Sequence, residues 1–226
     1  MATVIFDLDG TLADTAADLV GAANALADAA GWPRLDPVAE RTVAGQGGRA
    51  LIRRTMAGAG LAADEAAVDR LFPAFLAAYE ARIAEETQLF PGALDCLDAF
   101  AAMGWRIGLC TNKPEGLART LVSALGVADR FAALLGADTL PVRKPDPRHF
   151  TETVRRAGGE PGRALLIGDT VTDRDTARNA GAPCILVTFG YATEPLETLA
   201  PDAIAARLTE TPGLAAALLD SRRAAS

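Results

Sequence analysis

Short apolar runs alternate with helical patterns through most of the 226-residue sequence. The apolar runs lie at residues 3–6, 106–110, 133–135, 164–167 and 184–187, and the helical patterns lie at 91–103, 114–125, 147–157 and 172–180. Runs of this length are typical of strands that a parallel sheet buries on both faces. Alternation of such strands with helices indicates βαβ units, so we predict an α/β protein.

Residues 16–86 interrupt this alternation, because they contain no convincing strand. They hold Ala-rich helical patterns at 16–30, 48–59 and 64–85. Such a segment is too long for an ordinary connection between two strands. We therefore predict a Rossmann-like parallel-sheet core made of residues 1–15 and 87–226, with a small α-helical domain inserted at 16–86.

Charge and apolar content exclude several classes of partner. A net charge of -7 without a basic cluster would repel a phosphate backbone, so we expect no nucleic-acid partner. No apolar stretch approaches the length of a membrane span, and Asp7 lies where a signal peptide would be apolar. We expect a cytoplasmic protein, not bound to membranes, that is a monomer or a homodimer.

The cysteines and the single histidine do not form a recognisable site. The three cysteines are too widely spaced and odd in number for a disulfide framework or a zinc site, and we expect Cys110 and Cys184 to pack in the core. His149 has no second histidine or cysteine to join it, so we expect it to be structural or exposed.

Polar side chains follow the predicted strands, at the edge where an open parallel sheet binds ligands. Asp7 and Asp9 follow the first run, Thr111, Asn112 and Lys113 follow the second, Lys144 comes after the third, and Asp169 and Asp173 follow the fourth. Clustered carboxylates repel one another unless a cation joins them, and oxygen ligands without histidine or thiolate suit Mg²⁺. A magnesium site beside a lysine favours a phosphorylated substrate, and a carboxylate held against that phosphate can attack phosphorus.

Four stretches, DLDGTLADT, CTNKP, RKPDP and IGDTVTD, resemble the four sequence motifs of the haloacid-dehalogenase-like hydrolases, in the same order and each after the expected strand. The helical insert lies where that superfamily carries its cap domain. The resemblance implies that Asp7 is the nucleophile that forms an aspartyl-phosphate. It implies that Asp9 protonates the leaving group and then activates water. Lys144 would neutralise charge on the phosphoryl group, and Thr111 would donate its hydroxyl to it, with polar support from Asn112.

The same resemblance assigns the metal and the phosphate loop. Mg²⁺ would be bound by Asp7, the backbone carbonyl of Asp9 and Asp169, with Asp173 binding it directly or through water. Gly10 and Thr11 would let the backbone turn so that its N–H groups face the phosphate.

The substrate is suggested by weaker features. The segment from Ala44 to Arg49 resembles a glycine-containing cap loop of phosphoglycolate phosphatases, and the TNKP and TFGY stretches are typical of that group. If this holds, Arg49 is a candidate for binding the substrate carboxylate. Gly45 to Gly48 could equally be a turn between two helices. The expected reaction is Mg²⁺-dependent hydrolysis of a small phosphorylated metabolite, 2-phosphoglycolate, to glycolate and phosphate.

The same motifs occur in proteins with other functions. A phosphatase of different specificity or a pyrophosphatase remains open, as does a phosphotransferase similar to β-phosphoglucomutase, although residues 16–20 lack the histidine expected of such mutases. Asp9 argues against a dehalogenase. A non-enzymatic binding protein should show a broken motif, and this sequence shows none.

Several other acidic residues have simpler explanations. We expect Asp14, Thr15 and Asp146 to cap helices. We expect Asp18 and Asp28 to lie on the solvated face of an Ala-rich helix.

Overall fold

The computed structural model describes residues 1–224, and the chain divides into two compact units. The first, the core unit, comprises Met1–Ala13 and Leu89–Ser226, and the second, the helical unit, comprises Asp14–Gln88. These boundaries lie two residues outside the predicted insert at each junction. Within the described residues, no helix is long and apolar enough to cross a membrane.

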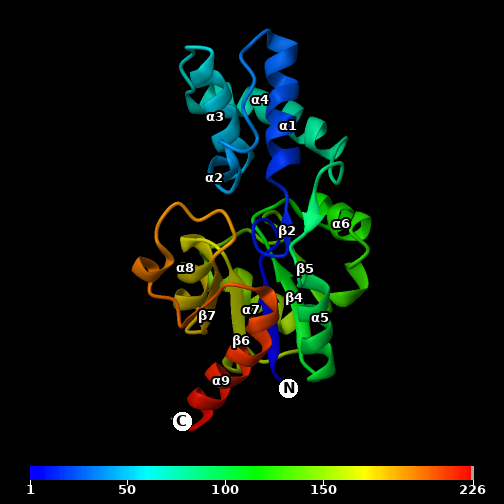
Figure 1. Ribbon diagram of the computed structural model, residues 1–226, viewed down its shortest axis with the longest axis vertical. Coiled ribbons are helices and arrows are strands. Elements are labelled where there is room, and N and C mark those ends of the chain that lie inside the picture. The colour runs from blue at the N-terminus through cyan, green and yellow to red at the C-terminus, as the bar shows by residue number, and fades with distance from the viewer. Residues whose placement is uncertain (225–226) are drawn as a thin grey trace. The chain divides into compact units, whose positions relative to one another are not determined.

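A six-stranded parallel sheet forms the centre of the core unit, with strand order β5-β4-β1-β6-β7-β8 (Figure 1). The strands are β1 (Thr3–Phe6), β4 (Arg106–Cys110), β5 (Ala133–Leu135), β6 (Ala164–Gly168), β7 (Cys184–Val187) and β8 (Ala203–Ala205). The predicted α/β fold is therefore confirmed. Strand β8 was missed because its Ala-Ile-Ala sequence is too short to show a pattern.

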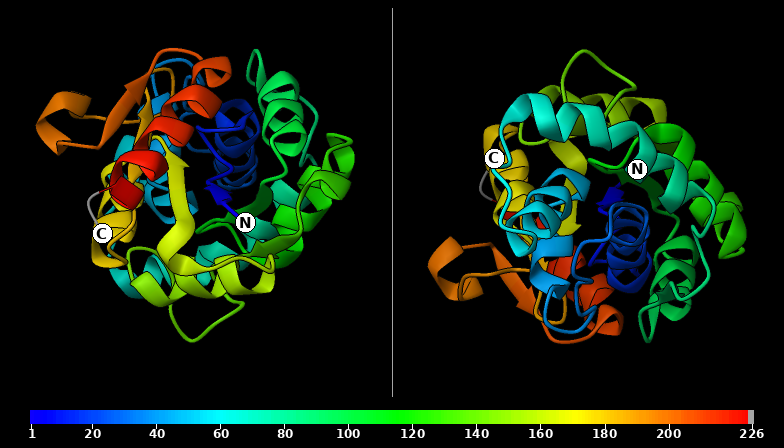
Figure 2. Two further views of the ribbon diagram at one scale, coloured as in Figure 1. Left: turned by 90° about the horizontal axis from the view of Figure 1, so that it is seen from below. Right: turned by 90° about the horizontal axis from the view of Figure 1, so that it is seen from above.

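Helices cover both faces of this sheet (Figure 2). They are α5 (Ala93–Ala102), α6 (Glu115–Ala124), α7 (Pro147–Arg156), α8 (Val171–Asn179) and α9 (Thr211–Ala224). Helices α5 and α9 contact each other and the sheet on one side, and α7 and α8 do so on the other. Four 3-10 helices complete the described part of the unit, at Ala128–Arg130, Pro161–Arg163, Leu196–Leu199 and Leu208–Glu210.

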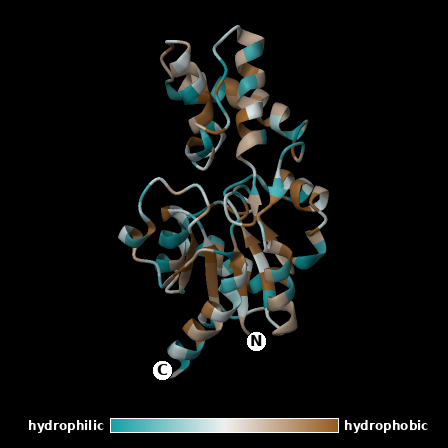
Figure 3. Cartoon of the chain, viewed as in Figure 1, coloured by the Kyte–Doolittle hydropathy of each residue, from teal (hydrophilic) through white to brown (hydrophobic). Residues whose placement is uncertain are grey.

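The strands are mostly apolar, which Figure 3 shows as brown ribbon in the sheet, and β1, β6 and β7 are buried along their whole length. Cys110 and Cys184 lie in the hydrophobic cluster between the sheet and α7 and α8, as predicted. His149 is buried beside them, with Nε2 3.0 Å from the carbonyl oxygen of Gly136 and Nδ1 3.4 Å from Cys110 Sγ. Burial lowers the pKa of His149 and so favours its neutral form, and these contacts give the side chain a structural role.

The helical unit is formed by α1 (Ala16–Ala30), α2 (Arg41–Ala44), α3 (Gly48–Gly58) and α4 (Glu65–Glu80), which pack on one another. A Cβ on Gly48 would lie 2.2 Å from the ring of Phe75, so the absence of a side chain there lets α3 approach α4 closely. The chain crosses between the two units in β2 (Ala13–Asp14) and β3 (Gln88–Leu89), which pair as a two-stranded sheet.

Asp18 corrects one expectation from the sequence. It lies in the first turn of α1 and is fully buried, not solvated. Its carboxylate accepts hydrogen bonds from the backbone N–H of Glu86 at 3.1 Å, and from the backbone N–H and hydroxyl of Thr87 at 2.9 and 2.7 Å. Helix α4 ends at Glu80, earlier than predicted, and the chain after it returns to α1 to make these bonds.

The other predicted caps give mixed results. Asp146 caps α7 by accepting from the backbone N–H of Arg148, as predicted. Thr15 occupies the N-cap position of α1, but its side chain makes no capping hydrogen bond. Asp14 forms an ion pair with Arg41. Asp28 lies on the exposed side of α1, as expected.

Candidate active site

Strand β1 leads two aspartates to the carboxyl edge of the core sheet. Its last residue, Phe6, is in register with Leu109 of β4 and Ile167 of β6. After Asp9 the chain turns at Gly10, whose φ of 80° lies in the left-handed region. A Cβ on Gly10 would lie 2.3 Å from Asp169 Oδ2, so any residue with a side chain would clash with Asp169 at this position.

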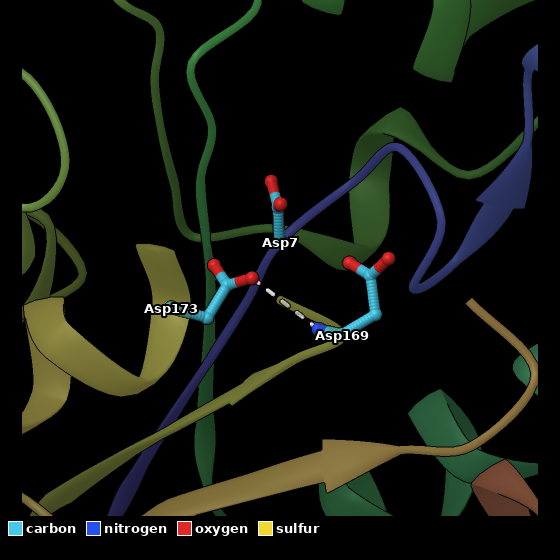
Figure 4. A group of neighbouring side chains, drawn as sticks. All are labelled: Asp7, Asp169 and Asp173. Carbon is cyan, nitrogen blue, oxygen red and sulfur yellow. Dashed lines mark hydrogen bonds between the residues drawn. The ribbon is translucent and has the colours of Figure 1, made fainter. Parts of the chain in front are cut away.

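Three carboxylates from separate segments meet at this edge (Figure 4). Asp7 follows β1, Asp169 follows β6, and Asp173 lies in the first turn of α8. One oxygen from each lies within 4.8 Å of the others. Asp173 Oδ2 also accepts from the backbone N–H groups of Asp169 at 3.3 Å and Thr170 at 3.1 Å, which fixes α8 against the end of β6. The structure thus brings together the three side chains that the sequence predicted as metal ligands.

Lys144 joins two of these carboxylates. Its Nζ lies 3.0 Å from Asp7 Oδ2 and 2.7 Å from Asp173 Oδ1. Burial acts to lower the pKa of Lys144, but the charges of Asp173 and Asp7 outweigh burial and raise it, so Lys144 is a permanent cation. The side-chain amide of Asn112 donates to the backbone carbonyl of Lys144 at 3.1 Å and so helps to position it.

The site carries an excess of negative charge. The pKa of Asp7 is raised to about 6, because burial and the charges of Asp173 and Asp9 together outweigh the opposing effect of Lys144. Burial, followed by the charges of Asp173 and Asp7, raises the pKa of Asp169 well above its ordinary value. Such a group of carboxylates suits a hard divalent cation, and a donor set made only of oxygen fits Mg²⁺.

Asp169 is held from two further directions. Its Oδ1 accepts from the hydroxyl of Thr11 at 3.0 Å, and its Oδ2 accepts from the backbone N–H of Tyr191 at 2.7 Å. A Cβ on Gly190 would lie 2.2 Å from Cβ of Asp169, so the TFGY segment can pass beside Asp169 only with glycine there. These contacts fix the orientation of the carboxylate.

Gly10 and Thr11 form the turn that was expected after Asp9. The N–H of Gly10 donates to Ala13 O at 2.9 Å, and that of Thr11 donates to Leu8 O at 3.3 Å, so both N–H groups bond within the turn itself. Contact of this loop with the phosphate stays a prediction.

The second aspartate has a lysine partner that the sequence analysis did not assign. Asp9 Oδ1 lies 2.9 Å from Nζ of Lys113, whose side chain is buried. The hydroxyl of Thr111 accepts from the backbone N–H of Lys113 at 3.1 Å, which orders this loop after β4. The sequence does distinguish Lys113 from the other basic residues, because Lys113 and Lys144 are the only lysines in the chain.

Arg49 belongs to the helical unit. It lies on α3 and forms ion pairs with Glu65 at 3.0 Å and Asp69 at 2.5 Å, with its guanidinium 5.3 Å from the centre of the Phe72 ring. Binding of a substrate carboxylate by Arg49 stays a prediction. Residues 45–47 form the turn between α2 and α3, which agrees with the structural alternative for this glycine segment.

Comparisons with known proteins agree with this geometry. The family model of the haloacid dehalogenase-like hydrolases matches residues 1–181. A phosphoglycolate phosphatase of Caulobacter vibrioides is 42% identical, with 97% of this chain and 93% of the relative covered. A phosphoglycolate phosphatase of Mesorhizobium japonicum is also 42% identical, with 89% and 88% covered. A crystal structure from Haemophilus somnus, described as a predicted phosphoglycolate phosphatase, superposes with a TM-score of 0.85 at 26% identity and covers 95% of this chain and 97% of that one.

Proposed function

Because the chain belongs to the haloacid dehalogenase-like hydrolases, we propose that it is a phosphatase that converts 2-phosphoglycolate to glycolate and phosphate. The observation that carries the reaction type is the group of Asp7, Asp169 and Asp173, of which the last two are buried, with Lys144 bridging Asp7 and Asp173. The substrate is supported by the relatives that bear the name phosphoglycolate phosphatase at 42% identity.

The reaction follows from the two aspartates after β1. Asp7 is held by the backbone N–H of Leu8, which donates to Oδ1 at 2.7 Å, and by Lys144 at Oδ2. A carboxylate oxygen of Asp7 bonds to phosphorus as the bond from phosphorus to the glycolate oxygen breaks, and Asp9 gives its proton to that oxygen. Asp9 then takes a proton from water as the water oxygen bonds to phosphorus and the bond between phosphorus and the Asp7 oxygen breaks. This second step releases phosphate and restores both aspartates.

The remaining residues neutralise the charge of the phosphoryl group and hold it in position. Lys144 neutralises the phosphoryl group as it transfers to Asp7, and the Thr111 hydroxyl donates to a phosphate oxygen. Asp7, Asp169 and Asp173 would hold Mg²⁺, together with the backbone carbonyl of Asp9. When bound, this ion supplies positive charge that lets a phosphate dianion approach the carboxylates.

We assign the helical unit as a cap domain, since it is inserted between the Asp7 motif and the Thr111 motif. In this role its Arg49 would contact the substrate carboxylate only after leaving Glu65 and Asp69, with which it is now paired. We also propose a cytoplasmic location and a monomer or homodimer.

The test is phosphate release from 2-phosphoglycolate, sugar phosphates, nucleoside monophosphates and pyrophosphate. The proposal predicts a marked preference for 2-phosphoglycolate that is lost with EDTA, restored by Mg²⁺ and absent in Asp7→Asn. Asp129→Asn is the matched control, because Asp129 lies exposed in the same unit. Preference for pyrophosphate or a sugar phosphate would replace the substrate, and full activity of Asp7→Asn would exclude the mechanism.

A further inference from the structure

Lys113 is a buried cation placed against the general acid. The chain has 22 lysines and arginines together, yet Lys113 and Lys144 are its only lysines, so arginine provides every other basic side chain. Lys113 is 7% exposed and Lys144 is 3% exposed. Each contacts one of the two aspartates after β1, Lys144 at Asp7 and Lys113 at Asp9.

The chemistry of the substrate places its carboxylate close to this lysine. Asp9 must come within hydrogen-bond distance of the ester oxygen that it protonates. In 2-phosphoglycolate a single methylene separates that oxygen from the carboxylate carbon. A group 2.9 Å from Asp9 Oδ1 is therefore a near neighbour of the substrate carboxylate whenever Asp9 contacts the ester oxygen.

The two other basic residues considered for this site are engaged elsewhere. Lys144 is held by Asp7 and Asp173 on the phosphoryl side of the reaction. Arg49 is held by Glu65 and Asp69 within the helical unit. An ammonium group can donate to more than one acceptor, so its contact with Asp9 is compatible with a second carboxylate.

We propose that Lys113 binds the carboxylate of the substrate and thereby selects phosphate esters that carry a carboxylate next to the ester oxygen. This inference rests on the proposed function, which it deepens by assigning specificity to a residue of the core unit. A substrate without that carboxylate cannot form this contact with Lys113, and this lowers its reactivity relative to 2-phosphoglycolate.

The experiment compares 2-phosphoglycolate with ethyl phosphate in the wild type and in Lys113→Met. Ethyl phosphate has the same kind of alkoxide leaving group, so both substrates need the proton from Asp9, but only one carries the carboxylate. The measured quantity is the ratio of kcat/KM for the two substrates. Removing one partner of a buried ion pair costs enough that we expect the ratio to fall by about 100-fold or more in Lys113→Met. Lys113→Arg, which keeps the charge, should retain part of the preference.

The two possible negative results distinguish a failure of the proposed function from a failure of the inference about Lys113. If the wild type shows no preference for 2-phosphoglycolate, the proposed function and the role of Lys113 both fail. If the wild type prefers it and Lys113→Met loses activity equally on both substrates, Lys113 only positions Asp9 and the inference is overturned while the proposed function stands. Thermal unfolding checks that Lys113→Met is folded, and Lys113→Gln provides the same comparison if it is not.

Discussion

Replacing Asp18 by alanine should destabilise the helical unit more than any exposed substitution on the same helix. Asp18 is fully buried, and its carboxylate is the acceptor for the N–H of Glu86 and for both the N–H and the hydroxyl of Thr87. It also lies 3.4 Å from Nε of Arg82. These bonds join the first turn of α1 to the last residues of the unit, so a single side chain links the two ends of the helical unit.

The expected loss of unfolding free energy follows from the hydrogen-bond donors that alanine would leave without an acceptor. The N–H and hydroxyl of Thr87 are buried, and an unsatisfied buried donor costs about 1–3 kcal/mol. The N–H of Glu86 is nearer the surface, where water can replace the carboxylate. We therefore expect Asp18→Ala to lower the free energy of unfolding of the helical unit by about 3 kcal/mol. Asp18→Asn retains one acceptor oxygen and should cost roughly half as much.

The assay is urea unfolding followed by the fluorescence of Trp32, which lies in the helical unit. Trp32 and Trp105 are the only tryptophans, so a Trp105→Phe background makes the signal specific to this unit. Asp28→Ala is the control: Asp28 lies on the same helix, pairs with Arg34, and has a side chain that is 53% exposed. Its loss should change stability by less than about 1 kcal/mol. Equal midpoints for Asp18→Ala and Asp28→Ala would refute the reasoning.

Three further predictions concern the core unit. Gly10→Ala and Gly126→Ala both force alanine into a positive φ, so each should cost about 1–2 kcal/mol of stability. Only Gly10→Ala should abolish phosphate release, because a Cβ at Gly10 would clash with Asp169, whereas a Cβ at Gly126 would meet nothing within 4 Å. Lys144→Met should reduce kcat by about 100-fold or more, and an unchanged kcat would mean that Lys144 does not act on the transferring phosphoryl group. His149 has a folded-state pKa below its unfolded value, so the stability that it contributes is present above the unfolded pKa and is lost as the pH falls toward the folded one. The difference in unfolding free energy between wild type and His149→Gln should therefore shrink between pH 7 and pH 5, and a difference that does not change with pH would contradict this.

The strands and the catalytic edge could be predicted because their signals are local. Strand β1 is an apolar run followed at once by Asp7, and its position in a parallel sheet places Asp7 beside the residues that follow the other strands. Asp169 directly follows β6, and Asp173 lies in the first turn of α8, which begins two residues after Asp169, so both side chains are expected at the carboxyl end of β6. These inferences need only the direction of each strand and the pitch of a helix.

Other features depend on contacts that the sequence does not display. Asp18 resembles a solvent-facing residue of an Ala-rich helix, and only the return of the chain to Thr87 makes it buried. The role of Lys113 depends on a neighbour more than 100 residues away in the chain, Asp9. The hydrogen bonds that the N–H groups of Gly10 and Thr11 make within their own turn are also not visible in the local sequence.

The central claim is that Asp7 carries the phosphoryl group, and the most direct measurement is acid-quenched turnover with substrate labelled in its phosphate. The account predicts label bound to the wild-type protein, released by hydroxylamine, and located on the peptide that contains Asp7. Asp7→Asn should carry no label and form no glycolate. Release of glycolate by Asp7→Asn at the wild-type rate would contradict the account, because another group would then have to receive the phosphoryl group.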